Sequence, residues 1–225
     1  MSDVAIFVTE KLGHKPKDLG LFERALTHSS LGRDSYERLE FLGDRVLGLV
    51  VGRWLYERFP AEPEGQLSRR YNALVARETC AEIGRELGLP ALIRLGKQAR
   101  EDNAGNSENV VGDVVEALIG ALLLDGGADA ADAFVRRAWA PHLDQQGSAP
   151  IHAKSALQEL AAARRLKTPA YEIVSRSGPH HTPRFTVRVS VGSAGEASAE
   201  GSSKQEAETA AAAALLSQLT PNRSA

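Results

Sequence analysis

The stretch Val110-Val-Gly-Asp113-Val-Val-Glu116-Ala-Leu-Ile-Gly-Ala-Leu-Leu-Leu124 decides how the first half of this chain folds. It is apolar at almost every position, which predicts a helix that is buried in a protein core. Asp113 and Glu116 are three residues apart and therefore share one face of that helix. Two carboxylates buried together are costly unless they are protonated, paired or bound to a metal ion. From the residues alone, a buried carboxylate pair with satisfied charges and one half of a metal site are about equal alternatives for Asp113 and Glu116.

A second acidic group improves the case for a metal. Glu37, Glu40 and Asp44 fall on one side of a helical wheel, without a Lys or Arg on the same stripe. The residues predicted for the opposite, core-facing side are Leu39, Leu42, Val46 and Val50. A solvated acidic face is the ordinary explanation, but like charges at this spacing repel each other. Carboxylates from two helices are hard ligands that suit Mg²⁺ or Mn²⁺ better than zinc.

Composition removes several other classes of protein. The chain has 225 residues, a formal net charge of −2 and one cysteine, Cys80. A polycationic tail protein, a disulfide framework and a cysteine zinc cluster are therefore excluded. No Glu-x-x-His pair of a di-iron bundle and no Gly-x-x-x-x-Gly-Lys phosphate loop occurs. With no signal peptide and no apolar run near ~20 residues, we expect a cytoplasmic protein without a membrane partner.

The pattern of the chain changes near residue 145. Residues 1–150 carry a net charge of −5 and residues 151–225 one of +3. Helical periodicity fills the first part, with helices expected over Ser68–Leu89, Ser107–Leu124 and Asp129–Trp139 and a stop at Gly126-Gly127. The second part predicts a helix over Ala153–Arg165, strands near 171–175 and 185–191, a weak strand over 195–200, and a helix over Lys204–Leu219. We therefore expect domains at 1–140 and 151–220, a linker at 141–150 and a tail at 221–225.

Several motifs resemble those of bacterial ribonuclease III. Tyr36-Glu-Arg-Leu-Glu-Phe-Leu-Gly-Asp-Arg-Val-Leu47 resembles the signature of that family, and Gly112–Ala121 resembles its second carboxylate motif. Glu64-Gly-Gln-Leu-Ser68 resembles its connecting loop. In the second half, the segments that resemble a double-stranded RNA-binding domain are Lys154–Leu160, Gly178-Pro-His-His181 and Ser203–Glu208.

The resemblance implies an all-α nuclease domain followed by a small α+β domain with the order α-β-β-β-α. It implies an endoribonuclease that cleaves double-stranded RNA by Mg²⁺-dependent hydrolysis, with Mn²⁺ as a possible substitute. The products would carry 5′-phosphates, 3′-hydroxyls and short 3′ overhangs, in the processing of ribosomal and other structured precursor RNAs. The implied metal ligands are Glu40, Asp44, Asp113 and Glu116. Asp44, Glu116 and Glu37 would act in catalysis, with Glu64 in support.

Other residues match binding positions of the family. Phe41, which the wheel places away from the core, matches a contact between the subunits of a homodimer. The residues that match RNA contacts are Gln158, Glu159, His181 and Lys204. The chain departs from the family pattern at Arg45, His152 and Gln205, and Gln205 should remove one phosphate contact. A duplex-binding protein with a degenerate nuclease domain is the rival hypothesis, but all five acids of the two motifs are present.

Overall fold

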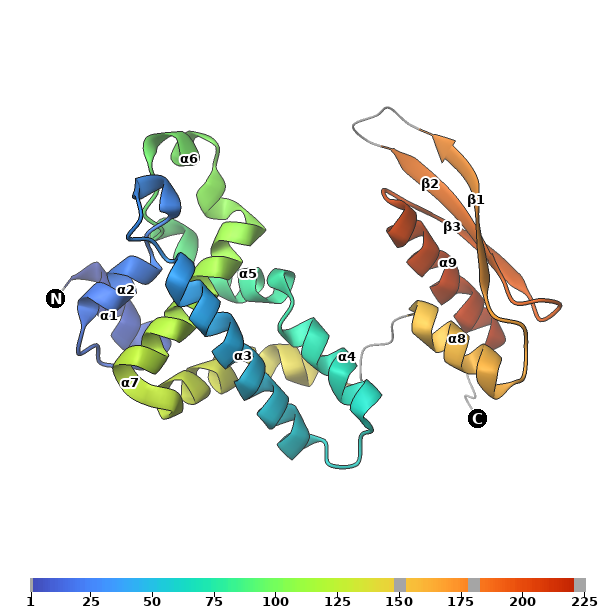
Figure 1. The fold of residues 1–225 in the computed structure, drawn as a ribbon, viewed down its shortest axis with the longest axis horizontal. Coiled ribbons are helices and arrows are strands. Elements are labelled where there is room, and N and C mark those ends of the chain that lie inside the picture. Colours follow the sequence, from blue (N-terminus) through green and yellow to red (C-terminus); the bar gives the residue numbers. More distant parts are fainter. Residues whose placement is uncertain (1, 148–152, 178–182, 221–225) are drawn as a thin grey trace. The chain divides into compact units, whose positions relative to one another are not determined.

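The structure is a computed structural model that describes residues 2–147, 153–177 and 183–220. The chain forms two compact units, Met1–Pro150 and Ile151–Ala225 (Figure 1). The predicted pair of folds, an all-helical unit followed by a helix–three strands–helix unit, is confirmed. Among the described residues, no helix has both the length and the apolar character needed to cross a membrane.

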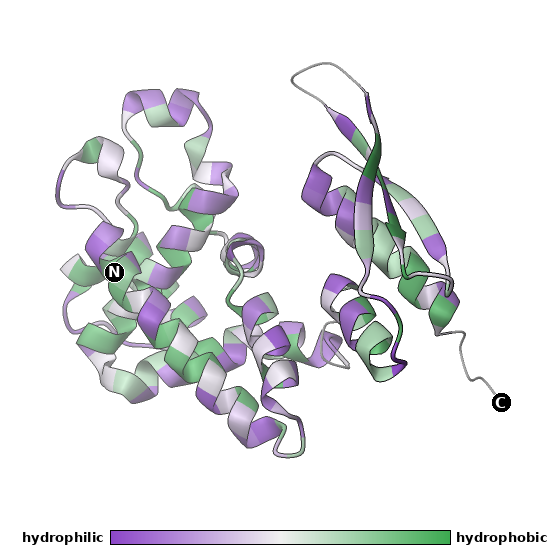
Figure 2. Cartoon of the chain, turned by 45° about the vertical axis from the view of Figure 1, so that its right-hand side comes forward, coloured by the Kyte–Doolittle hydropathy of each residue, from purple (hydrophilic) through white to green (hydrophobic). Residues whose placement is uncertain are grey.

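In the described part of the first unit every regular element is a helix, and one β-bridge joins Thr27 and Arg94. Its elements are α1 (Asp3–Phe7), η1 (Val8–Leu12), α2 (Leu19–Ala25), η2 (Ser29–Leu31), α3 (Glu37–Arg58), α4 (Glu64–Leu74), α5 (Arg77–Glu86), η3 (Leu89–Ala91), α6 (Lys97–Glu101), η4 (Ala104–Asn106) and α7 (Glu108–Gln145). Hydrophobic and hydrophilic residues alternate along these helices (Figure 2), as amphipathic packing requires. The core forms mainly where α3 and α5 pack on α7.

Two of the expected helix boundaries differ in the structure. The single helix expected over Ser68–Leu89 is wrong, because α4 ends at Leu74 and α5 begins at Arg77. The buried indole of Trp139 donates a hydrogen bond of 2.8 Å to the Leu74 carbonyl, which replaces a helical partner there. The expected stop near Gly126-Gly127 is present as a break, since Gly127 has a non-helical φ of 79°. Beyond it α7 continues to Gln145, so the proposed linker at 141–150 begins inside this helix.

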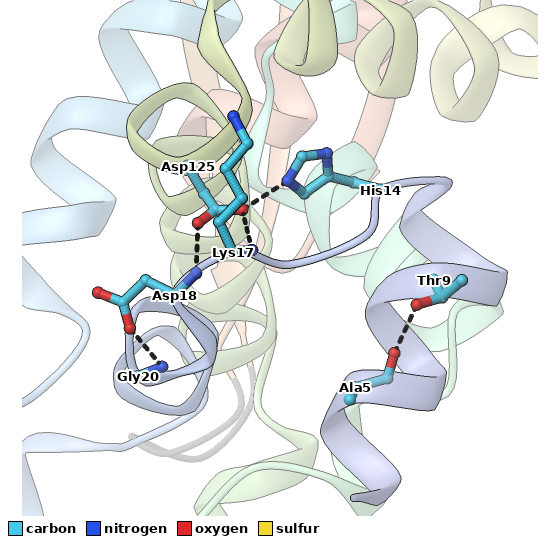
Figure 3. Close-up of polar contacts among 7 residues, drawn as sticks. All are labelled: Ala5, Thr9, His14, Lys17, Asp18, Gly20 and Asp125. Atoms are coloured by element: carbon cyan, nitrogen blue, oxygen red, sulfur yellow. Dashed lines mark hydrogen bonds and ion pairs between the residues drawn. The ribbon is translucent and has the colours of Figure 1, made fainter. Parts of the chain in front are cut away.

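Asp125 anchors the N-terminal segment to α7 just before that break (Figure 3). Its carboxylate contacts His14 Nε2 at 2.6 Å and accepts hydrogen bonds from the backbone N–H groups of Lys17 at 2.9 Å and Asp18 at 2.7 Å. Burial alone would raise the pKa of Asp125, but these hydrogen bonds outweigh it and the pKa lies below its usual value. Asp125 therefore stays ionised although the residue is only 8% exposed.

The second unit is a three-stranded sheet with two helices packed on it. Its elements are α8 (Ala153–Ala163), β1 (Ala170–Ser177), β2 (Arg184–Ser190), β3 (Glu196–Gly201) and α9 (Lys204–Leu219). The strands are antiparallel in the order β1-β2-β3, with Val187 opposite both Ile173 and Ala199. Leu157, Val189 and Leu215 are fully buried between helices and sheet. The weak strand predicted over 195–200 forms as β3, because pairing with β2 supplies the hydrogen bonds that its small residues need.

Candidate active site

The site is built where α3 crosses α7, and two glycines allow the crossing. A Cβ atom on Gly43 would lie 1.7 Å from the backbone oxygen of Glu116, and one on Gly120 would lie 2.4 Å from the backbone oxygen of Leu39. Only residues without a side chain fit at such a close approach. Because Gly43 lies between Glu40 and Asp44, this contact places the acids of α3 beside those of α7.

One expectation about α3 is wrong. The wheel placed the acids opposite the core, whereas Glu40 and Asp44 flank Gly43, which lies in the buried stripe of the helix. The buried residues of α3 are Leu39, Gly43, Leu47, Val50, Val51 and Leu55. Glycine carries no hydropathy signal, so the wheel could not show that this side faces another helix. Glu40 and Asp44 are partly buried as residues, although the Asp44 side chain is still 42% exposed.

Three carboxyl groups influence one another at the crossing. Burial, with the charges of Glu40 and Asp113, raises the pKa of Glu116 to about 7. Burial, followed by the charges of Asp113 and Glu37, raises the pKa of Glu40. Burial also raises the pKa of Asp113. Desolvation and mutual repulsion both favour protons on these groups, and a bound cation would relieve both.

Two further side chains of this region were not predicted from the sequence. The Tyr36 hydroxyl donates a hydrogen bond of 3.3 Å to Asp113 Oδ2 and holds that carboxylate in place. The guanidinium of Arg77 donates to Asn109 Oδ1 at 2.9 Å, and its charge opposes the rise in the pKa values of Glu40, Asp113 and Glu116. Tyr36 immediately precedes the acidic stripe, which was the available signal. Arg77 is distant in sequence and carried none.

The other predicted residues of the first unit have contacts of their own. Asp44 forms an ion pair with its neighbour Arg45, whose guanidinium carbon lies 5.3 Å from the centre of the Phe41 ring. Glu37 is exposed and accepts a hydrogen bond of 3.3 Å from Ser35. Glu64 is the first residue of α4, where its carboxylate accepts a hydrogen bond of 2.6 Å from Ser68.

The chemistry of the donors fits a divalent metal, although no finished site is formed. Within residues 2–147, 153–177 and 183–220, no group of three or more His, Cys, Asp or Glu side chains is arranged to hold an ion. The acids at the crossing are carboxylates only, which are the ligands that Mg²⁺ and Mn²⁺ prefer. Their raised pKa values show that the uncompensated charges are unfavourable as they stand.

The RNA-binding candidates of the second unit divide between two places. Gln158 of α8 and Lys204 of α9 line one groove of about 650 Å³. Glu159 is exposed on α8 and is not among the residues that line this groove. His181, like the departure His152, lies outside the described residues. Gln205, a departure from the pattern that the resemblance implies, lines the same groove as Lys204.

Comparison with known proteins identifies the family. Residues 18–143 match the family model described as Ribonuclease-III-like, and residues 153–219 match the double-stranded RNA binding motif. A Ribonuclease 3 of Zymomonas mobilis is 60% identical over 93% of this chain and 85% of its own length. The chain belongs to the ribonuclease III family. It is an endoribonuclease of that family with a domain for double-stranded RNA.

Further relatives agree with this membership of the ribonuclease III family. A Ribonuclease 3 of Brucella canis is 48% identical over 94% of this chain and 88% of its own length. The crystal structure of the ribonuclease III nuclease domain from Campylobacter jejuni matches with a TM-score of 0.60 and 34% identity, over 63% of this chain and 97% of that one. A second structure of that domain, with a TM-score of 0.57, describes flexibility in a region involved in dimer formation; it is 35% identical, over 59% of this chain and 93% of that one.

Proposed function

We propose that the carboxylates at the α3–α7 crossing hold Mg²⁺ for hydrolysis of phosphodiester bonds in double-stranded RNA, and that Mn²⁺ can substitute. Glu40, Asp113 and Glu116 are the proposed ligands, with Asp44 as a further ligand or as the residue that orients water. The observation that carries this proposal is the close packing of α3 on α7 at Gly43 and Gly120, which brings carboxylates of both helices together; the raised pKa values of these groups agree with it. When bound, the metal would activate water and neutralise charge on the phosphate.

The surrounding side chains have distinct proposed tasks. Tyr36 fixes the orientation of Asp113 through its hydroxyl, which stays protonated because burial and the nearby acids raise the pKa of Tyr36. Arg45 restrains the Asp44 carboxylate through their ion pair. The charge of Glu37 adds to the field that favours a cation at Glu40. Glu64 stays a supporting candidate of the family pattern, since the hydrogen bond described for its carboxylate comes from Ser68.

We also propose that two copies of the chain form a homodimer through Phe41. This ring is 64% exposed, and a single exposed apolar side chain is ordinary by itself. It borders a groove of about 720 Å³ whose apolar lining includes Leu21, Leu39 and Leu124. A self-complementary contact in which each Phe41 enters the other copy's groove would cover both features. The dimer region described for the C. jejuni nuclease domain supports this proposal.

The second unit is proposed to hold the duplex while the first unit cuts it. Gln158, Glu159, His181 and Lys204 are the proposed contacts, which would recognise A-form shape, 2′-hydroxyls and phosphates. The expected products are duplexes with 5′-phosphates, 3′-hydroxyls and short 3′ overhangs. The proposed substrates are ribosomal and other structured precursor RNAs, and the cytoplasm stays the proposed location.

The substitution Glu116→Gln tests the proposed metal role. It keeps the size of the side chain but removes its charge, so we expect cleavage of labelled duplex RNA in Mg²⁺ to be lost while RNA binding is kept. Mg²⁺ should raise the melting temperature of the original protein more than that of the variant, since a ligand that binds the folded state stabilises it. Glu108→Gln, on the exposed first turn of α7, is the matched control and should keep cleavage. Full activity of Glu116→Gln would contradict the assignment.

A further inference from the structure

The groove between α8 and α9 contains ion pairs that involve both of these helices. Lys154 of α8 and Lys204 of α9 line the groove, and Glu208 lies between them. One oxygen of Glu208 accepts a hydrogen bond of 2.6 Å from Lys154 Nζ, and the other lies 3.7 Å from Lys204 Nζ. A single carboxylate therefore links two cations that come from opposite ends of the domain's sequence.

We propose that Lys154 is a further contact for an RNA backbone phosphate, and that Glu208 is the residue that positions Lys154 and Lys204 for this task. The proposal rests on the proposed RNA-binding role of Lys204 and adds two residues to it. Lys154 is 38% exposed at its side chain and Lys204 is 61% exposed, whereas Glu208 is 15% exposed. The two cations thus face the solvent while the anion lies beneath them.

The surroundings of Lys154 restrict its ammonium group to one place. Its Nζ atom lies 4.8 Å from the centre of the Tyr171 ring, in addition to its hydrogen bond with Glu208. Contact with the face of an aromatic ring and with a carboxylate both favour a charged ammonium at this point. A free lysine side chain loses rotamer entropy on binding a phosphate, and a lysine held in advance loses less.

The geometry leaves Lys154 able to bind a second anion. An ammonium group has three N–H donors, and Glu208 uses one of them in the described contact. The groove that the two lysines share also contains the amides of Gln158 and Gln205, which can donate to phosphate oxygens. The groove therefore brings together two ammonium groups and two side-chain amides that can donate to an anion.

A positioning role and a purely electrostatic role of Glu208 predict opposite changes in RNA affinity when the charge of Glu208 is removed. If Glu208 only adds a negative charge near the phosphates, removing the charge should tighten RNA binding. If Glu208 positions the lysines, the variant Glu208→Gln should bind duplex RNA about threefold more weakly, the scale of a partly exposed ion pair. The slope of log K against log salt should also become shallower, by up to about one unit, as one phosphate contact is lost.

The test is a titration of labelled duplex RNA with the full chain in a chelator, which keeps the RNA intact if cleavage needs a metal. Binding constants are measured between about 50 and 200 mM KCl. Glu200→Gln is the matched control, since Glu200 is an exposed glutamate of the same domain that pairs with Arg184 on the sheet. It should bind as well as the original protein or slightly better. Unchanged or tighter binding by Glu208→Gln would overturn the positioning role.

A double-mutant cycle distinguishes a positioning role of Glu208 from a general loss of folding in its variant. Lys154→Ala should weaken binding, and Glu208→Gln should weaken it less in the Lys154→Ala background than in the original chain, because part of its effect acts through Lys154. Additive losses in the two variants, or an unchanged affinity of Lys154→Ala, would overturn the proposal. Failure of the original chain to bind duplex RNA would overturn the proposed function as well, whereas equal affinities of the original chain and Glu208→Gln overturn only the positioning role.

Discussion

Replacing Gly43 by alanine should move Glu40 and Asp44 of α3 away from Asp113 and Glu116 of α7. A Cβ atom at this position would lie 1.7 Å from the Glu116 backbone oxygen, whereas carbon and oxygen atoms rarely approach closer than about 3.3 Å. The shortfall of roughly 1.5 Å must be met by moving α3 and α7 apart, because the obstacle is backbone rather than a flexible side chain. Overpacking of this kind costs about 1–3 kcal/mol of unfolding free energy. Misplacing catalytic groups by ~1 Å lowers the rate by ~100-fold.

The control for this substitution is available on the same helix. A Cβ atom on Gly52 of α3 has no atom within 4 Å, so Gly52→Ala should stabilise the protein by about 0.5–1 kcal/mol and leave cleavage unchanged. Unfolding in urea and the rate of duplex cleavage under saturating RNA would be measured for both variants. A Gly43→Ala protein with the original stability and the original rate would refute the account of the crossing.

Three further predictions follow from other contacts. Asp125→Asn should cost about 1–3 kcal/mol of unfolding free energy near neutral pH. Because the pKa of Asp125 is lowered in the fold, its stabilisation is present above the unfolded pKa of ~3.9 and is lost as the pH falls; equal acid denaturation of variant and original would oppose this. Phe41→Ala should shift sedimentation from dimer towards monomer, whereas Tyr56→Ala, an exposed aromatic on the same helix, should not. Cleavage in low Mg²⁺ should fall as the pH drops through about 7, the pKa of Glu116. The pH at which half of the activity is lost should move lower as Mg²⁺ is raised, because metal and protons compete for the same carboxylates. A half-activity pH that does not change with Mg²⁺ would argue against these carboxylates as metal ligands.

The acidic residues of the site could be predicted because their pattern conflicts with their surroundings. Asp113 and Glu116 interrupt an apolar helix, and the conflict between charge and burial is visible in the sequence itself. The order of elements in the second unit was also predictable, including β3, since alternation and turn residues mark its segments. These signals are local, and they need no knowledge of which helices meet.

Features that depend on contacts between distant segments could not be predicted in the same way. The predicted orientation of α3 was wrong because Gly43 contributes no hydropathy signal, although it lies at the crossing with α7. The Leu74 carbonyl at the end of α4 accepts a hydrogen bond from Trp139, which is 65 residues away. Arg77 reaches the acids, and Glu208 reaches Lys154, only through tertiary packing. Single residues of ordinary surface type give no sign of such partners.

The most direct test of the central claim is cleavage of end-labelled RNA by the full chain, with duplex and single-stranded substrates, in Mg²⁺ and in a chelator. If the carboxylates at the α3–α7 crossing act through a divalent metal on duplex RNA, the duplex is cut in Mg²⁺ to products with 5′-phosphates, and the other three mixtures stay intact. Cutting in the chelator, equal cutting of the single strand, or an intact duplex in Mg²⁺ would contradict the account.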